Sequence, residues 1–154
     1  MVKLSKTAFF DEKDVAILAA LKENGRFSSQ QVAKRTRLPI STVHNRIKKM
    51  EGIGAIKGYT VVMDEKKTGM IAAYVLIIVN YHPPDGTIID QYELAKRIRH
   101  ISGVEEVSMT TGSADILIKV RTRNVDELNE LITRQLRSFK GVDKTQTLVV
   151  LNSI

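Results

Sequence analysis

Apolar side chains recur every three or four residues through the first fifty positions, and this spacing predicts short helices that bury one face. The first helix is expected to begin at Asp11, because an Asp side chain can accept hydrogen bonds from the free N–H groups of a helix start. Val15, Leu18 and Leu21 form its apolar stripe. Gly25 supplies its C-terminal stop.

A second helix start is marked more strongly. Ser28 as N-cap and Gln31 three residues later form a capping-box pattern. Phe27 and Val32 are placed as a hydrophobic staple across that start. The helix is expected to be short, because Pro39 disfavours helical geometry in the residue before it.

A third helix is expected over residues 39–52, with Pro39 tolerated in its first turn. Val43, Ile47 and Met50 lie within about 60° of one another around its axis and form an apolar face. The remaining face carries Ser41, Thr42, His44, Asn45, Lys48 and Lys49. Hydroxyl, imidazole, amide and ammonium groups can hydrogen-bond base edges and phosphates in a DNA major groove.

A short helix, a tight break and an amphipathic helix with a polar outer face are typical of a helix-turn-helix DNA-binding unit. Residues 52–54, with two glycines, are expected to end the third helix. Residues 55–62 are interpreted as a strand pair or wing. The alternative is a three-helix bundle whose polar face meets only water.

The distribution of charge favours the first of these interpretations. The chain has 24 basic and 17 acidic residues, which gives a formal charge of +7. Residues 1–60 contain 12 of the basic and 5 of the acidic residues, so the whole excess lies there and residues 61–154 are neutral. Such a concentration favours a polyanion such as DNA as partner, although charge alone also fits a basic face in solvent.

Other classes of function lack the residues that they need. The chain has no Cys and its three His lie far apart in the sequence, so we expect neither a metal site nor a cofactor. The longest apolar run, residues 70–79, is about half of the roughly 20 residues that span a bilayer. Residues 1–7 have no signal-peptide core, so a cytoplasmic protein is expected. No Walker loop, dinucleotide glycine pattern or paired-carboxylate arrangement indicates an enzyme.

The second half of the chain alternates between strand and helix patterns. Expected strands cover residues 70–80, 103–111, 115–122 and 142–151, and expected helices cover residues 88–100 and 125–139. The junction between helix and strand has the same pattern in both halves, Gly103-Val104-Glu105 and Gly141-Val142-Asp143. The order βαββαβ predicts a ferredoxin-like α/β sandwich with helices on one sheet face. The other face is bare and apolar, so a partner subunit is expected to cover it.

At this point the chain resembles the leucine-responsive regulatory protein / asparagine-synthesis regulator (Lrp/AsnC) family, from about residue 11 to residue 151. In the first half the resemblance is carried by Asp11, Asp14, Ile17-Leu18, Leu21, Asn24-Gly25-Arg26, Leu38, Ser41-Thr42-Val43, Arg46-Ile47, Met50-Glu51 and Gly54-Ala55-Ile56-Lys57-Gly58-Tyr59. In the second half it is carried by Thr111-Gly112-Ser113-Ala114-Asp115 together with the βαββαβ order.

The resemblance implies an α+β transcription regulator with three parts. These are a winged helix-turn-helix DNA-binding domain over residues 1–60, a linker or hinge over 61–69, and a ferredoxin-like βαββαβ domain over 70–154. The last domain would bind an effector, usually an amino acid, and form dimers that often associate into octamers. The effector site would lie between dimers, beside the loop of Thr111, Gly112, Ser113, Ala114 and Asp115. Asp115 would position the ligand or the loop, and Gly112 would allow close approach.

Within the DNA-binding domain the expected contacts divide into two kinds. Bases would be read by Ser41, Thr42, His44 and Asn45. Phosphates would be neutralised mainly by Arg35, Arg37, Lys48, Lys49 and Lys57. Arg46 completes the expected DNA-binding set. In a symmetric dimer the two recognition helices would enter successive major grooves of double-stranded DNA, about 34 Å apart, and the protein would be nucleoid-associated.

The sequence also departs from the family pattern. Ser113 and Ala114 stand where many members have an acidic and an aromatic residue, so the sequence does not identify the effector, and a plain hairpin turn is the alternative for residues 112–115. The loop over residues 81–87 is longer than usual and is expected to alter an assembly contact. Two alternatives remain open: a nucleoid protein that coats DNA without an effector, and a tetrapyrrole decarboxylase on the same two-domain plan.

Overall fold

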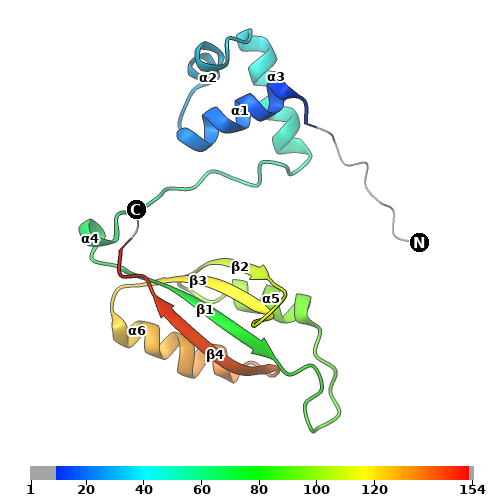
Figure 1. Cartoon of the computed structure of the whole chain (residues 1–154), viewed down its shortest axis with the longest axis vertical. Helices are drawn as coiled ribbons and strands as arrows, with labels where there is room; N and C mark the ends of the chain where they lie inside the picture. Colours follow the sequence, from blue (N-terminus) through cyan, green and yellow to red (C-terminus); the bar gives the residue numbers. More distant parts are fainter. Residues whose placement is uncertain (1–9, 153–154) are drawn as a thin grey trace. The chain divides into compact units, whose positions relative to one another are not determined.

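The computed structural model describes residues 10–152 (Figure 1), so the sequence interpretation of residues 1–7 lies outside the described residues. The chain divides into two compact units whose boundary lies between Val62 and Met63. The N-terminal unit contains α1 (Glu12–Glu23), α2 (Ser29–Thr36) and α3 (Ile40–Gly52). Within residues 10–152, no helix is long and apolar enough to cross a membrane.

The predicted helix starts of the N-terminal unit are confirmed. Asp11 accepts hydrogen bonds from the N–H groups of Lys13 and Asp14, at 2.9 and 3.0 Å, and the Asp14 carboxylate accepts the Asp11 N–H in return. Ser28 and Gln31 form the same reciprocal pair at the start of α2. Each cap satisfies N–H groups that a helix start otherwise leaves without a partner.

The three helices enclose a small core of their own. Ile17, Val32 and Val43, one from each helix, are completely buried in it. Arg37 is the C-cap of α2 and its backbone is left-handed, with φ 56°. Pro39 is the N-cap residue of α3 and makes no side-chain capping bond. Residues 37–39 join α2 to α3, and the apolar face of α3 packs inward while its polar face stays exposed.

The strand pair predicted over residues 55–62 is absent. The N–H groups of Ala55 and Ile56 both donate to the carbonyl of Met50 at the end of α3, and the structure has no strand before residue 71 in the part of the chain that it describes. A strand needs a neighbouring backbone edge to form its ladder, and a unit of three helices offers none. The polar linker predicted over residues 61–69 contains one short helix, α4 (Glu65–Thr68).

The C-terminal unit is a four-stranded antiparallel sheet with helices on one side (Figure 1). Its further elements are β1 (Ile71–Val79), α5 (Gln91–Arg99), β2 (Val104–Met109), β3 (Ile116–Thr122), α6 (Val125–Glu130), the π-helix η1 (Leu131–Gln135), the 3-10 turn η2 (Leu136–Ser138) and β4 (Val142–Val149). The strand order is β2-β3-β1-β4, and each neighbouring pair runs antiparallel. This arrangement confirms the predicted ferredoxin-like βαββαβ fold.

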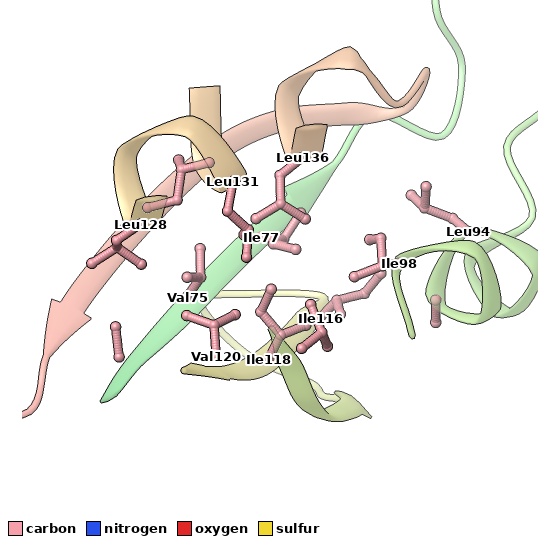
Figure 2. Close-up of a cluster of buried hydrophobic side chains, with 14 of the residues drawn as sticks. Val75, Ile77, Leu94, Ile98, Ile116, Ile118, Val120, Leu128, Leu131 and Leu136 are labelled. Carbon is pink, nitrogen blue, oxygen red and sulfur yellow. The ribbon is translucent and has the colours of Figure 1, made fainter. Parts of the chain in front are cut away.

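The core of this unit lies between the sheet and its helices (Figure 2). Val75 and Ile77 of β1 and Ile118 of β3 are completely buried beneath Ile98 of α5 and Leu136. The helix α5 begins at Gln91, three residues later than the sequence pattern predicted, because the preceding Asp caps the N–H groups of the first turn. Its start is therefore set by a cap, although the apolar pattern extends further back.

The second predicted helix is not one regular α-helix. Its buried side chains are Leu128, Leu131, Ile132 and Leu136. An α-helix would carry Leu136 about 80° past Leu128, since eight residues exceed two turns. The π-helix η1 takes up the extra residue: the Leu136 N–H donates to the carbonyls of both Leu131 and Ile132. All four side chains consequently reach the same core.

The sheet face opposite the helices is apolar along its centre. Tyr74, Leu76 and Ile78 of β1 lie on this face, and the strand register places Leu117 of β3 and Leu148 of β4 beside them. Tyr74 and Ile78 are each 38% exposed and Leu148 is 48% exposed. These five side chains form what we call the open face. Lys119 and Gln146 lie on the same side of the sheet by the same register, so the apolar surface predicted from the sequence is confined to a strip.

At one end of the sheet, Arg121 joins α4 to two strands. Its guanidinium pairs with Glu105 of β2 at 2.5 Å and with Glu65 of α4 at 3.0 Å, and its side chain is only 6% exposed. Hydrogen bonding to Glu105 is the main cause that raises the pKa of Arg121, with burial acting in the opposite direction. Lys119 lies 3.7 Å from Glu105 and completes the cluster. The short helix is thereby part of the C-terminal unit.

The two helix-to-strand junctions that repeat in the sequence have the same backbone conformation at their glycines. Gly103 and Gly141 both have positive φ, at 89° and 97°. A Cβ at Gly103 would lie 2.9 Å from the carbonyl oxygen of Arg121, and a Cβ at Gly141 would lie 2.7 Å from Ile89. Both helix-to-strand turns therefore need glycine for conformation and for space.

Candidate functional site

The polar face of α3 is exposed as the sequence predicted. Ser41, His44, Asn45, Lys48 and Lys49 are all exposed on it, whereas Thr42 is half-buried at its margin. None of these side chains makes a hydrogen bond or an ion pair with another described residue. The face thus offers amide, hydroxyl, imidazole and ammonium groups that the fold itself does not use.

Arg46 differs from its neighbours on α3. Its guanidinium bonds to Asp11 at 2.7 Å and to Asp14 at 2.8 Å, both at the start of α1, and its side chain is 26% exposed. These hydrogen bonds, led by the one to Asp14, raise the pKa of Arg46. The N–H of Asp14 and then the Arg46 guanidinium lower the pKa of Asp11. Arg46 therefore fastens α3 to α1, and its cationic group is already occupied.

The remaining basic residues of the predicted set lie outside α3. Arg35 pairs with Glu23 at 2.9 Å and its guanidinium lies 4.3 Å from the centre of the Phe27 ring. Arg37 is exposed in the turn before α3. Lys57 lines a hollow of about 880 Å³ against the C-terminal part of α1. Arg37 thus lies in the turn directly before α3, whereas Arg35 is held by a neighbouring acid.

A second hollow, of about 460 Å³, lies between α2 and the start of α3. It is lined by Gln30, Lys34 and Ile40 among others, and Ile40 is 52% exposed. Gln30 and Lys34 were not among the residues predicted from the sequence. Their spacing of four residues places them on one exposed side of α2, and this was the signal that could have identified them.

The loop between β2 and β3 is a closed turn with an exposed tip. The Thr110 N–H donates to the Asp115 carbonyl at 2.8 Å, and the Thr110 hydroxyl donates to the Ala114 carbonyl at 2.7 Å. Thr111, Gly112 and Ser113 are exposed at the tip. Gly112 has φ 110° and free space around its Cβ position. Within residues 10–152, the N–H groups of these three tip residues donate to no protein acceptor.

Asp115 occupies the base of this loop and is half-buried. One carboxylate oxygen accepts the Val79 N–H at 2.7 Å and the other accepts the Tyr81 hydroxyl at 2.9 Å. Burial, followed by the hydrogen bond to Asp115, raises the pKa of Tyr81. Of the two roles that the family resemblance implied for Asp115, these contacts match the positioning of the loop.

Among the described residues, no group of three or more His, Asp or Glu side chains is placed to hold a metal ion. Most of the predicted site residues lie on the polar face of α3 or in the loop between β2 and β3. These two places lie in different units of the chain.

Comparisons with known proteins match both units. Residues 10–51 match the model of the AsnC-type helix-turn-helix domain, and residues 73–154 match that of the Lrp/AsnC ligand binding domain. An HTH-type transcriptional regulator of Pyrococcus furiosus is 35% identical over 139 residues, covering 90% of this chain and 91% of its own. The regulator LysM of Sulfurisphaera tokodaii is 36% identical over 141 residues, covering 92% and 94%.

Solved structures agree with the sequence matches. The structure of E. coli AsnC is 27% identical, covers 94% of each chain and has a TM-score of 0.69. A transcriptional regulator from Neisseria meningitidis in complex with L-Met is 24% identical, covers 95% of this chain and 92% of its own, and has a TM-score of 0.74. The second likeness is evidence for the fold alone.

Proposed function

The chain belongs to the Lrp/AsnC family of transcriptional regulators, and we propose that it binds double-stranded DNA with the polar face of α3 and senses an amino acid with the loop between β2 and β3. The observation that carries the DNA proposal is the set of exposed polar side chains on α3 that have no partner among residues 10–152. An exposed face rich in donors next to a net positive charge is the pattern that DNA recognition needs.

The proposed contacts follow the availability of each side chain. Base edges would be read by Ser41, Thr42, His44 and Asn45, and phosphates would be held by Lys48, Lys49, Arg37 and Lys57. Arg35 reaches a phosphate only by leaving Glu23. Arg46 holds α3 against α1, so we assign it to orienting the recognition helix in place of direct DNA contact.

Assembly is the second part of the proposal. The open face supports pairing of two chains about a twofold axis, because it presents a strip of apolar side chains to solvent. Such a homodimer would present two α3 helices to successive major grooves, about 34 Å apart. The proposal also includes further association to an octamer and a nucleoid-associated location in the cytoplasm. Residues 1–60 would bind DNA and residues 70–154 would bind the effector, and residues 61–69 would link them, with α4 of the linker held to the sheet by Arg121.

The loop between β2 and β3 supports an amino-acid effector by its chemistry. Its tip offers three N–H groups without an intramolecular acceptor among the described residues, and successive N–H groups bind anions such as a carboxylate. The Neisseria meningitidis regulator was solved as a complex with L-Met. In this proposal, a bound amino acid changes how dimers associate and so changes the geometry in which DNA-binding units are presented.

The DNA proposal is tested by changing two phosphate-contacting lysines together. Lys48→Ala with Lys49→Ala should weaken binding to every duplex and reduce the slope of log affinity against log salt by at most about two units per DNA-binding unit. Arg134→Ala with Arg137→Ala, two exposed basic residues of the C-terminal unit, removes the same charge and is the matched control. Equal slopes for both variants would exclude the lysines from the interface.

Specificity and sensing need two further measurements. Asn45→Ala should lower the affinity for the protein's own upstream DNA more than for unrelated DNA. The reason is that the side-chain amide of an Asn can donate and accept a hydrogen bond at the edge of one particular base. The same titrations are repeated with L-methionine and then with each other standard amino acid. Tight binding without preference for sequence or response to any amino acid would instead favour the DNA-coating alternative.

A further inference from the structure

Three chain segments converge on Asp115. Its carboxylate accepts the Val79 N–H at the end of β1 and the Tyr81 hydroxyl in the loop that follows. Its carbonyl oxygen accepts the side-chain amide of Gln91, in the first turn of α5, at 2.7 Å. Its own N–H donates to the Ile77 carbonyl at 2.9 Å. One residue at the base of the loop is therefore fixed from the strand, from the following loop and from the helix.

These contacts compete with any direct contact between Asp115 and a ligand. Each oxygen of this half-buried carboxylate already accepts one hydrogen bond, so a ligand ammonium group could reach only the remaining lone pairs or would have to displace the Val79 N–H or the Tyr81 hydroxyl. Leaving a buried donor unpaired costs more than the new hydrogen bond returns. The tip residues Thr111, Gly112 and Ser113, by contrast, are exposed, and their N–H groups have no acceptor among the described residues.

We propose that Tyr81 and Gln91 are positioning residues of the effector site, and that they act by holding Asp115, which in turn sets the conformation of the loop tip. This inference rests on the proposed effector function of that loop. It assigns a role to Tyr81 and Gln91, which lie outside the loop, 34 and 24 positions before Asp115 in the sequence. In this proposal Asp115 makes no ion pair with the ligand. Its negative charge is therefore dispensable, whereas its hydrogen bonds to Val79 and Tyr81 are required.

Charge and shape can be separated by substitution. Asp115→Asn keeps an acceptor for the Val79 N–H, and its amide can donate to the Tyr81 oxygen, so affinity for the strongest-binding standard amino acid should fall by less than about tenfold. Asp115→Ala removes both contacts and should weaken binding by more than tenfold. Tyr81→Phe should weaken it about three- to tenfold, whereas Tyr92→Phe, an exposed tyrosine on α5, is the matched control and should have no effect.

A double variant tests whether Tyr81 acts through Asp115. Tyr81→Phe should add nothing to the loss already caused by Asp115→Ala, because the hydroxyl then has no carboxylate to hold. Gln91→Ala should weaken amino-acid binding while leaving the affinity for DNA in the absence of amino acid unchanged, which would show that the DNA-binding unit and the dimer that presents it are intact. Additive losses, or abolition of binding by Asp115→Asn, would overturn the inference and make Asp115 a direct ligand contact.

The inference can also be decided without a ligand. Amide hydrogen exchange at Thr110 and Asp115, measured on the free protein, should be faster in Tyr81→Phe than in Tyr92→Phe, since the base of the loop is then less well held. Equal exchange in the two variants would refute the positioning role. If the wild-type chain bound no amino acid, the proposed sensing function would fail, and this exchange experiment would still decide the role of Tyr81.

Discussion

Gly141→Ala adds a single methyl group at a position where the structure predicts both backbone strain and a side-chain collision. The backbone at Gly141 has φ 97°, and the new Cβ would lie 2.7 and 3.0 Å from the two γ-carbons of Ile89. Gly112→Ala is the matched control, because its φ is 110° and no atom lies within 4 Å of its Cβ position. The two variants share the conformational strain and differ in the collision.

The expected magnitudes follow from those two contributions. A positive φ costs a residue with a side chain about 1–2 kcal/mol, so Gly112→Ala should lower the free energy of unfolding by that amount. Overpacking against a partly buried side chain adds about 1–3 kcal/mol. Gly141→Ala should therefore cost about 2–5 kcal/mol, a large part of the stability of a domain of this size.

Tyrosine fluorescence can report on the C-terminal unit alone. The chain has no Trp, and of its four Tyr only Tyr59 belongs to the N-terminal unit. Urea unfolding is therefore followed in a Tyr59→Phe background, at one protein concentration because dimerisation stabilises the folded chain.

Ile89→Ala provides the decisive comparison. It removes both γ-carbons, and in its presence Gly141→Ala should cost within about 1 kcal/mol of Gly112→Ala. If Gly141→Ala cost no more than Gly112→Ala in the native background, or if Ile89→Ala gave no relief, the collision would not be the cause of the loss.

Three further changes test other contacts. Bonding to Lys140 lowers the pKa of Asp85 from 3.8 to about 2, so Asp85 stabilises the fold above pH about 4 and less as the pH falls through about 2. The difference in Tm between wild type and Asp85→Asn should close across that range, and a difference that persisted below it would contradict the pairing. Arg121→Met should cost about 1.5–3 kcal/mol and speed amide exchange over residues 65–68, because two carboxylates lose their shared cation. Arg46→Ala should lower the Tm of the N-terminal unit without changing the salt slope of DNA binding, and a reduced slope would place Arg46 on a phosphate.

The features that sequence could predict are those decided by neighbours along the chain. The capping boxes at Asp11 and Ser28 use residues three positions apart, and the order of strands and helices follows from the spacing of apolar residues. The duplicated junction was visible as a repeat, although the need for glycine there depends on Ile89 and on the carbonyl oxygen of Arg121. Local signals thus gave the elements and their order.

Contacts between distant residues could not be predicted in this way. Arg46 was expected on DNA because its basic side chain lies in the recognition helix, and its partners are 32 and 35 residues earlier. The Asp115 carboxylate finds both its partners 34 and 36 residues away. The absent strand pair over residues 55–62 has the same origin, since apolar residues can suggest a strand but cannot supply the second edge that a ladder requires.

The π-helix η1 means that this chain carries one residue more than its helix needs. The buried positions Leu128, Leu131, Ile132 and Leu136 are spaced 0, 3, 4 and 8, and removing one exposed residue such as Thr133 would make the spacing 0, 3, 4 and 7, that of an ordinary amphipathic α-helix. A single-residue deletion, which elsewhere in a helix rotates everything beyond it by about 100°, would here restore a regular helix. The π-helix η1 therefore resembles a one-residue insertion that the fold tolerates. A chain one residue shorter at this point could keep the same core.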